Sequence, residues 1–224
     1  MWKGFLAGLA VANGFEWVAH KYILHGTHRA GKPRYSPVPD SMKSHWEHHR
    51  EVRKTDFHDQ GYVEGISNWR TKNEIISLAV VAGVFGTAFY PVSKGMSLAV
   101  LYCAGNYYYI HRRAHLEPEW AMKRIPWHYD HHMNSNQDAN WCVTKPWFDY
   151  ILGTRVISAP ELQEANPLGI LLPPLLSDAL TRAVNKVRPA KWVERKLKAI
   201  EGAEASALQA APAEAGQGGA AAAL

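Results

Sequence analysis

HWEHH at residues 45–49 and HYDHH at residues 128–132 repeat one histidine pattern, HxxHH, in distant parts of a chain of 224 residues. Two other clusters accompany them, HKYILH at residues 20–25 and HRRAH at residues 111–115. Neutral imidazole is the commonest metal-binding side chain. Ten clustered imidazoles without a cysteine cluster favour iron, zinc, copper or nickel over calcium or magnesium. The predicted metal ligands are His20, His25, His45, His48, His49, His111, His115, His128, His131 and His132.

The spacing within each cluster predicts how the imidazoles converge. Residues three and four apart share one face of a helix, so each HxxHH cluster can direct three side chains to one point and HRRAH can direct two. His20 and His25 are five residues apart, which separates them by about 140° on a regular α-helix. We therefore expect that helix to end or bend near His25, where Gly26 offers a stop. One ion would leave most of the ligands unused, so the clusters predict a site for two metal ions.

A histidine taken alone is more often a surface residue or a satisfied core residue than a metal ligand. Here one pattern occurs twice, and HxxxH lies thirteen residues before its second copy. A purification tag would be contiguous, and these clusters are not. The two remaining histidines, His28 and His58, lie outside the pattern and are predicted not to be ligands.

Length and composition are consistent with one domain followed by a tail. Cys103 and Cys142 are far apart and form no metal or redox motif, which indicates a reducing compartment or no disulfide role. The net charge is +5, but the basic residues are not grouped in one arm or stripe. We therefore expect no nucleic-acid partner, and the distribution of charge indicates a membrane instead.

Three apolar stretches are candidate membrane spans, namely residues 2–24, 75–90 and 95–110. The second and third carry no charge and are 16 residues long. As helices they would measure about 24 Å, a little short for a hydrocarbon core of about 30 Å. Residues 91–94 join them as a predicted tight helical hairpin. The alternative is a buried hairpin in a soluble protein.

The uneven distribution of lysine and arginine favours membrane insertion over a soluble hairpin. If all three stretches span it, only Lys3 and Lys94 of the 25 lysines and arginines lie on one side. All the others lie on the side of the histidine clusters, as the positive-inside rule expects of a cytoplasmic face. We therefore predict an all-α, integral membrane protein, in which a membrane-embedded helical bundle carries a cytosolic, histidine-rich metal-binding cap.

We expect three regions along the chain. Residues 1–160 form the membrane domain with the four clusters, and residues 161–200 form an amphipathic C-terminal helical segment. The apolar face within residues 175–187 is followed by basic residues, which favours a helix lying on an anionic membrane surface or packed onto the domain. Residues 201–224 are mostly Ala, Gly, Glu and Gln without apolar periodicity, and we predict that they are disordered.

The four clusters, in this order, resemble the fatty acid hydroxylase/sterol desaturase superfamily of membrane di-iron enzymes. The segment VTKPWFDYILGT at residues 143–154 is also similar to that family, and the resemblance covers about residues 10–157. It implies a helical membrane bundle whose cytosolic cap binds two iron ions through the ten clustered histidines, with zinc as an alternative in a purified sample. The chain departs from the family in its short N-terminus, which leaves the number of spans open.

The resemblance also implies an O2-dependent oxidoreductase that hydroxylates, or desaturates, an unactivated C–H bond of a membrane lipid. The expected substrate is a fatty-acyl chain or a sterol, and the expected electron source is a separate cytochrome b5- or ferredoxin-type donor with its reductase. A carotenoid ring hydroxylase is the second choice: that related branch also begins with a motif like HKYILHG, but its third cluster tends to be one residue longer than HRRAH. A non-catalytic, zinc-holding protein of the same fold and a membrane metal transporter are the two remaining hypotheses.

Two further sets of residues are predicted to lie near the metals. Acceptors of the second imidazole N–H should orient the ligands. The carboxylates near the clusters are Glu16, Glu47, Asp130 and Asp138. Aromatic residues near the span ends line the lipid path or form an interfacial aromatic belt. These are Trp69, Tyr107, Tyr108 and Tyr109.

Overall fold

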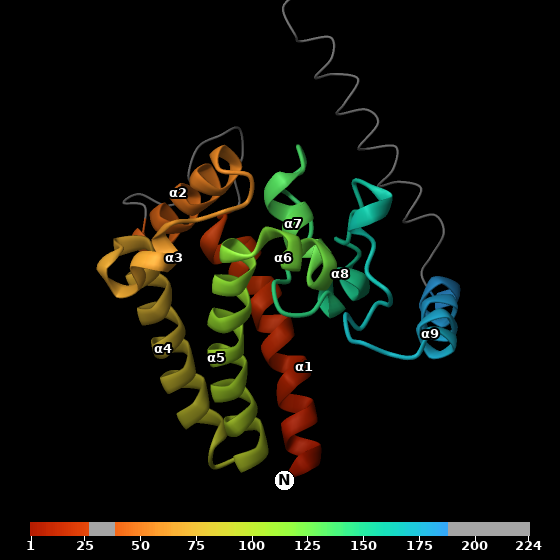
Figure 1. Cartoon of the computed structure of the whole chain (residues 1–224). Coiled ribbons are helices and arrows are strands. Elements are labelled where there is room, and N and C mark those ends of the chain that lie inside the picture. The colour runs from red at the N-terminus through yellow and green to blue at the C-terminus, as the bar shows by residue number, and fades with distance from the viewer. Residues whose placement is uncertain (27–38, 188–224) are drawn as a thin grey trace, which may run out of the picture. The chain divides into compact units, whose positions relative to one another are not determined.

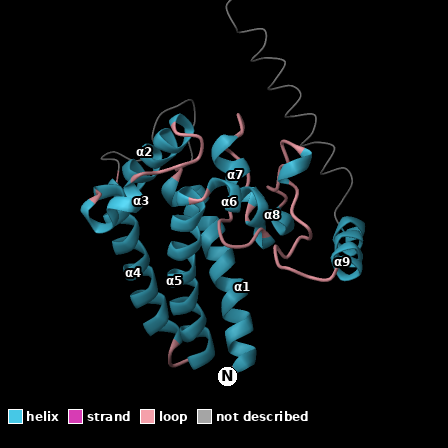
Figure 2. Cartoon of the chain, viewed as in Figure 1, coloured by secondary structure: helices cyan, strands magenta, loops and turns pink. Residues whose placement is uncertain are grey.

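The computed structural model describes residues 1–26 and 39–187, and within these ranges the regular structure is helical, without a strand (Figures 1 and 2). The predicted all-α class is confirmed. In chain order the elements are α1 (Trp2–Val18), η1 (Ala19–Leu24), α2 (Asp40–Lys54), α3 (Gly61–Glu64), η2 (Gly65–Ser67), α4 (Trp69–Phe89), α5 (Lys94–Leu116), α6 (Pro118–Arg124), α7 (Pro126–Met133), α8 (Trp147–Leu152), η3 (Pro160–Leu162) and α9 (Pro174–Val187).

Helices α1, α4 and α5 form a three-helix sheaf in which α5 packs against both of the others (Figure 1). The close approach of α1 and α5 depends on glycine, because a Cβ atom at Gly95 would collide with the backbone carbonyl of Met1. On the other side, the Ser97 hydroxyl of α5 donates to the Gly86 carbonyl of α4 (2.7 Å). The predicted hairpin is confirmed, since α4 ends at Phe89 and α5 begins at Lys94.

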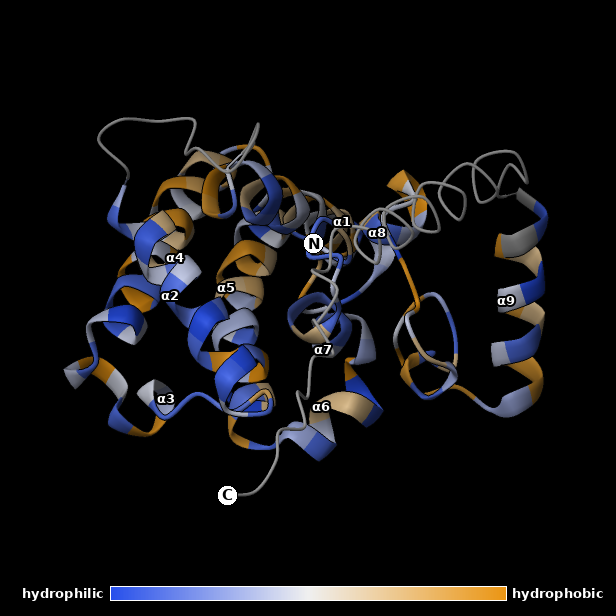
Figure 3. Ribbon diagram, turned by 90° about the horizontal axis from the view of Figure 1, so that it is seen from above, coloured by the Kyte–Doolittle hydropathy of each residue, from blue (hydrophilic) through white to orange (hydrophobic). Residues whose placement is uncertain are grey.

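Hydrophobic residues cover much of this sheaf (Figure 3). Among the described residues, α4 alone is long and apolar enough to cross a membrane by length and composition, and only 6% of its apolar window is buried. Its Val80 and Val84 side chains are each 58% exposed. Residues 2–24 and 95–110, the other expected spans, form the continuous helix α1–η1 and most of α5.

Helices α2, α3 (Gly61–Glu64), α6 and α7 gather at one end of the sheaf (Figure 1). Helix α2 packs on α4 and η1, and α7 packs on α2 and α6. The core between them is apolar and includes Val52, Phe57 and Trp127, all fully buried. Helix α7 begins at Pro126, a position that suits proline because its missing N–H is not needed in the first turn of a helix.

The loop that follows α7 is fastened to α1. Glu16 accepts hydrogen bonds from the backbone N–H (2.8 Å) and the hydroxyl (2.7 Å) of Thr144. Next to it on α1, the Trp17 indole N–H donates to the Thr154 hydroxyl (2.9 Å). These bonds hold residues 139–145 against the first helix.

A buried ion-pair network then fixes the chain beyond this loop to α7. The Arg155 guanidinium contacts Asp130 of α7 (3.0 Å) and Glu164 (2.6 Å), and all three side chains are almost wholly inaccessible. Buried charges need such partners, because removing one leaves the other uncompensated. The network therefore holds the helix that carries the last histidine cluster.

The compact unit runs from Met1 to Asn185, and a second unit begins at Lys186. Helix α9 starts at Pro174, and its Leu175 side chain is 82% exposed. Residues 188–200, where the basic segment is predicted, and the tail at 201–224 lie outside the described residues, as does His28.

Candidate metal centre

The four histidine clusters meet where the shorter helices join the sheaf. HKYILH lies at the end of η1, HWEHH on α2, HRRAH at the end of α5 and HYDHH on α7. All ten predicted ligands are buried, although their segments are separated by up to about a hundred residues. The structure therefore brings together every imidazole that the sequence singled out, while His58 stays outside both of the groups described next.

The imidazole nitrogens form two groups, and within each group the candidate ligand atoms all lie within 4.8 Å of one another. The first group contains His20, His25, His45, His49 and His131. The second contains His48, His111, His115 and His132. His128 adjoins the second group, with its Nε2 3.2 Å from Nε2 of His115. The groups touch, because the ring centroids of His49 and His132 are 4.1 Å apart.

Each HxxHH cluster contributes to both groups, which corrects the expectation that its three side chains converge on one point. On α2, His45 and His49 belong to the first group and His48 to the second. On α7, His131 and His132 are likewise divided. Neighbouring residues on a helix differ by about 100° in direction, so a pair such as His131 and His132 faces two different centres.

The π-helix η1 explains the five-residue spacing of the first cluster. The His25 N–H donates to the His20 carbonyl (3.0 Å), the i to i+5 bond of a π-helix. Because a π-helix has more residues per turn, residues five apart lie on the same face, and the ring centroids of His20 and His25 are 5.0 Å apart. The separation of about 140° expected from a regular helix is therefore wrong. The stop at Gly26 is confirmed, with φ +65°, a conformation that favours glycine.

Backbone carbonyls orient two rings of the first group. Nδ1 of His20 donates to the Trp141 carbonyl (2.5 Å), and Nδ1 of His131 donates to the Ala139 carbonyl (2.7 Å). Because Nδ1 carries the proton, Nε2 of each neutral ring keeps its lone pair. Both carbonyls belong to the loop that Glu16 fastens to α1, so that loop fixes the direction of these nitrogens.

Carboxylates orient two rings of the second group, while Nδ1 of His115 donates to the Phe57 carbonyl (2.9 Å). Nδ1 of His48 donates to Asp59 Oδ2 (2.7 Å), and Asp59 Oδ1 is held by Arg70 (2.7 Å). Nδ1 of His111 donates to Glu74 Oε1 (2.7 Å), and the Tyr62 hydroxyl, 2.8 Å from the same nitrogen, donates to Glu74 Oε2 (2.6 Å). Such partners set both the tautomer and the direction of a ligating imidazole.

These acceptors differ from the four carboxylates that the sequence suggested. Glu16 binds the loop at Thr144, and Asp130 binds Arg155. The Asp138 side chain is exposed, and Glu47 is half-buried on α2, where its neighbour His48 donates to Asp59 instead. Proximity in the sequence misled the prediction, because the acceptors come from other segments. The sequence did contain one signal for Glu74, which directly precedes an apolar stretch. An ionisable residue in a membrane-spanning segment is a candidate functional residue.

The unprotonated nitrogens face one another at the distances that a shared cation would impose. Nε2 atoms of His20 and His45 are 3.1 Å apart, and those of His25 and His131 are 3.2 Å apart. With metal–nitrogen bonds of about 2.0–2.1 Å, neighbouring ligands are separated by roughly 3.0–3.4 Å. Nε2 of His48, His111 and His132 is buried without a hydrogen-bond partner. The residues present therefore fit two adjoining metal ions.

Burial keeps the imidazoles neutral, as metal ligands must be. It lowers the pKa of His45, His48 and His132 well below the ordinary value, and the neighbouring imidazoles lower it further. For His131 burial lowers the pKa to about 4, with the Ala139 carbonyl opposing the shift. A charged imidazole is disfavoured in this crowded, water-poor site.

Metal-free protein is expected to lose stability as the pH falls from about 6.5 to about 4. An unfolded histidine binds its proton below about pH 6.5, whereas folded His131 binds it only near pH 4. Because the unfolded state binds more protons across this window, stability falls with pH, by roughly 3 kcal/mol for His131 alone.

The measurement is the thermal unfolding midpoint of chelator-treated protein as a function of pH. Metal-loaded protein is the control, since occupied nitrogens resist protonation and its midpoint should hold to lower pH. A midpoint of the metal-free protein that stays level throughout this window would contradict a cluster of buried, neutral imidazoles.

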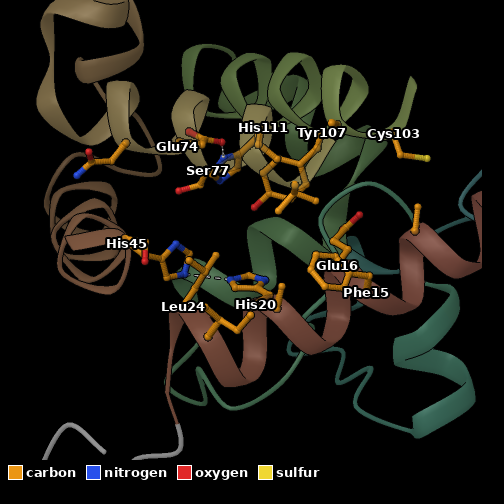
Figure 4. Close-up of a pocket in the computed structure, with 18 of the residues that line it drawn as sticks. Phe15, Glu16, His20, Leu24, His45, Glu74, Ser77, Cys103, Tyr107 and His111 are labelled. Atoms are coloured by element: carbon orange, nitrogen blue, oxygen red, sulfur yellow. Dashed lines mark hydrogen bonds and ion pairs between the residues drawn. The ribbon is translucent and has the colours of Figure 1, made fainter. Parts of the chain in front are cut away.

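A cavity of about 270 Å³ adjoins the histidine groups (Figure 4). His20, His45, His48 and His111 line it beside the candidate metal centre. The part between the long helices is walled by apolar side chains of α1, α4 and α5. These are Val11, Ala12, Phe15, Leu78, Val81, Phe85, Phe89 and Val100.

The cavity separates the four aromatic residues that were predicted to lie near the metals. Of the four aromatic candidates only Tyr107 lines it, with its ring beside His111 at 5.3 Å between centroids. Trp69 and Tyr109 are 43% and 59% exposed, and Tyr108 does not line the cavity. Successive helical residues point in different directions, so only one member of the Tyr107–Tyr109 run can face inward.

The chain matches no family model, no curated protein and no solved structure in the comparisons with each. Its function is therefore inferred from the residues and geometry described above. Those residues form two buried, adjoining histidine groups that could hold metal ions.

Proposed function

We propose that this chain is a membrane-embedded, O2-dependent di-iron oxygenase similar to the fatty acid hydroxylase/sterol desaturase superfamily. Its reaction would be hydroxylation of an unactivated C–H bond of a membrane lipid, either a fatty-acyl chain or a sterol. One observation carries the proposal: imidazoles from four remote segments form two adjoining groups beside an apolar cavity. Neither a buried core histidine nor a surface histidine requires that arrangement.

The donor set favours iron over zinc. The first group offers five imidazole nitrogens, whereas structural zinc sites take four ligands in a tetrahedron. His20, His25, His45, His49 and His131 would therefore suit an ion that accepts more than four ligands. Imidazole suits iron, copper and nickel as well as zinc, and of these iron with open positions is typical of oxygenases.

Bound iron would activate dioxygen and supply the oxidant that breaks the C–H bond, placing one oxygen atom in an alcohol and the other in water. This reaction also consumes two electrons and two protons. The electrons would come from a separate cytochrome b5- or ferredoxin-type donor with its reductase. Loss of a second hydrogen instead of oxygen transfer would give an alkene, so desaturation is the related outcome.

The chain's own residues prepare the site for this chemistry. Asp59, Glu74 and the loop carbonyls keep the Nε2 lone pairs directed inward. Apolar side chains such as Val81 and Phe85 would bring a hydrocarbon next to the histidines and exclude water. Exclusion of water protects a reactive oxidant from side reactions.

The surface of the sheaf supports membrane insertion with the metal site at one interface. Large apolar side chains are exposed along all three long helices, among them Leu6 on α1, Val84 on α4 and Leu101 on α5. Exposed apolar area on this scale marks a membrane or protein contact. The positive-inside asymmetry supports a cytoplasmic location for the histidine end.

Lipid analysis of cells that express the chain tests this function. Wild-type protein should produce a new oxygenated lipid that depends on O2, and His131→Ala should abolish it. The matched control is His58→Ala, which removes an imidazole outside both groups and should leave the product unchanged. Fatty acids, sterols and carotenoids should all be supplied, so that a carotenoid ring hydroxylase is also detected.

Two further classes of protein are distinguished by the same experiment. A zinc-holding, non-catalytic protein would bind metal and leave the lipid profile identical in wild type and His131→Ala, which would reject the proposed enzyme. A metal transporter would change the metal content of the cells instead. Its ligands would be expected at mid-membrane, whereas the histidines here lie at the ends of α1–η1 and α5 and on the shorter helices α2 and α7.

A further inference from the structure

The cavity beside the histidines is bounded by three helices of the sheaf. Helix α5 packs against both α1 and α4, and its Val100, Cys103 and Tyr107 form one wall. Residues of α1 and α4 form the two other walls (Figure 4). The space therefore follows the long axes of the helices between α1 and α4.

The cavity is narrow for its length. Its lining on α4 extends from Arg70 to Phe89, which is about 28 Å of helix. Its volume is about 270 Å³, whereas sites for compact, drug-sized ligands hold roughly 300–1,000 Å³. A volume of this size spread along such a length suits one extended chain better than a compact ring system.

Polarity changes along the cavity face of α4. The residues near the N-terminal end are Arg70, Asn73 and Ser77, and further along the helix Val81 and Phe89 are apolar. The histidine groups adjoin the polar end, since Glu74 of the same face binds His111. An amphiphile in this cavity would therefore place its polar end towards Arg70 and its hydrocarbon tail towards Phe89.

A pair of aromatic rings bridges the apolar part. Phe15 of α1 and Phe85 of α4 both line the cavity, and their ring centroids are 4.9 Å apart with the planes tilted by 56°. This contact joins the two helices beside the cavity that both rings line. The bulk at these two positions therefore limits how a chain can lie beyond the histidines.

Resting on the proposed function, we propose that this cavity binds a single unbranched acyl chain with its polar end towards Arg70, and that Phe15 and Phe85 determine which chain lengths are accepted. A sterol or a carotenoid would be excluded by the width of the channel. Oxidation would fall on the part of the chain closest to its polar end, because the histidines adjoin that end of the cavity.

The first measurement does not require turnover. Purified full-length protein in detergent is irradiated with palmitic acid carrying a terminal diazirine, and labelled peptides are mapped by mass spectrometry. We expect labelling of the α1 and α4 residues that line the cavity. Phe85→Trp should reduce it about tenfold at a sub-saturating probe concentration, since added bulk is poorly accommodated in a filled site. Val84→Trp is the matched control, because Val84 is exposed on the same helix.

Two further results are expected. Unlabelled palmitic acid should compete with the probe, whereas cholesterol should not. In cells, Phe85→Ala should shift the oxygenated products towards longer acyl chains relative to wild type and Val84→Ala. Labelling that is equal in Phe85→Trp and Val84→Trp, or competition by cholesterol, would overturn the proposal.

The outcomes separate this inference from the proposed function. If wild-type protein is labelled inside the cavity but yields no oxygenated lipid, the proposed enzyme activity is rejected and the acyl-chain site is retained. If the protein oxygenates lipids but the Phe85 variants change neither the labelling nor the chain lengths of the products, the enzyme activity is retained and the acyl-chain site is rejected. The thermal unfolding midpoint and the metal content of Phe85→Trp and Phe85→Ala show whether either variant is misfolded.

Discussion

Single alanine substitutions in the two histidine groups are expected to remove the two metal ions separately. His49→Ala takes from the first group a nitrogen that lies 3.1 Å from Nε2 of His45. His115→Ala takes from the second a nitrogen that lies 3.2 Å from Nε2 of His128. Each variant leaves the other group intact, so iron per chain should fall from about two ions to about one, and the double variant should hold almost none.

Elemental analysis of protein reconstituted with ferrous iron measures this result. Oxygenated lipid should disappear in both single variants, because the two ions are proposed to act together on O2. His58→Ala is the control, since its side chain is outside both groups, and it should keep both the iron and the product. A double variant that still holds two ions would show that the metals lie elsewhere.

Asp59→Asn is expected to weaken metal binding without touching a ligand. Asp59 accepts from Nδ1 of His48 (2.7 Å) and from Arg70 (2.7 Å), and it also accepts from the Gly61 N–H (2.8 Å). The amide has nearly the same shape, but it lacks the charge that balances Arg70 and makes the His48 ring a better donor to metal. Loss of such a partner costs about 10–100-fold in metal affinity.

Competition titration with a chelator of known affinity measures the change, and one ion should be released earlier than in wild type. The matched control is Asp138→Asn, because Asp138 follows the HYDHH cluster closely in sequence but its side chain is exposed. It should titrate like wild type. Equal affinities in Asp59→Asn and wild type would mean that the carboxylate does not position His48 for a metal.

The local elements were predictable because their patterns are local. The two apolar stretches placed a helical hairpin with its turn at residues 91–94, and the structure has this hairpin between Phe89 and Lys94. The five-residue gap between His20 and His25 indicated an irregularity before Gly26. It did not reveal that the irregularity is a π-helix, because the bond from the His25 N–H to the His20 carbonyl depends on where the rings must point.

The partners of the imidazoles could not be predicted in the same way. Glu16 and Asp130 were among the carboxylates nearest to the clusters in sequence, yet they hold a loop and a buried arginine. Asp59 and Glu74 act instead because α2, α4 and α5 converge at one end of the sheaf. A hydrogen bond requires atoms within about 3 Å of each other, and sequence separation does not determine such a distance between different helices.

The sequence alone determined which ten side chains converge, because repeated HxxHH and HxxxH spacings are improbable in any other role. It also determined that the chain is helical, because the apolar runs and histidine intervals follow the helical period. Only the tertiary structure decided how each HxxHH cluster is divided between two centres, which acceptors orient the rings, and which member of residues 107–109 faces the cavity. Those outcomes depend on the rotation and crossing of packed helices, which the periodicity of a single helix leaves free.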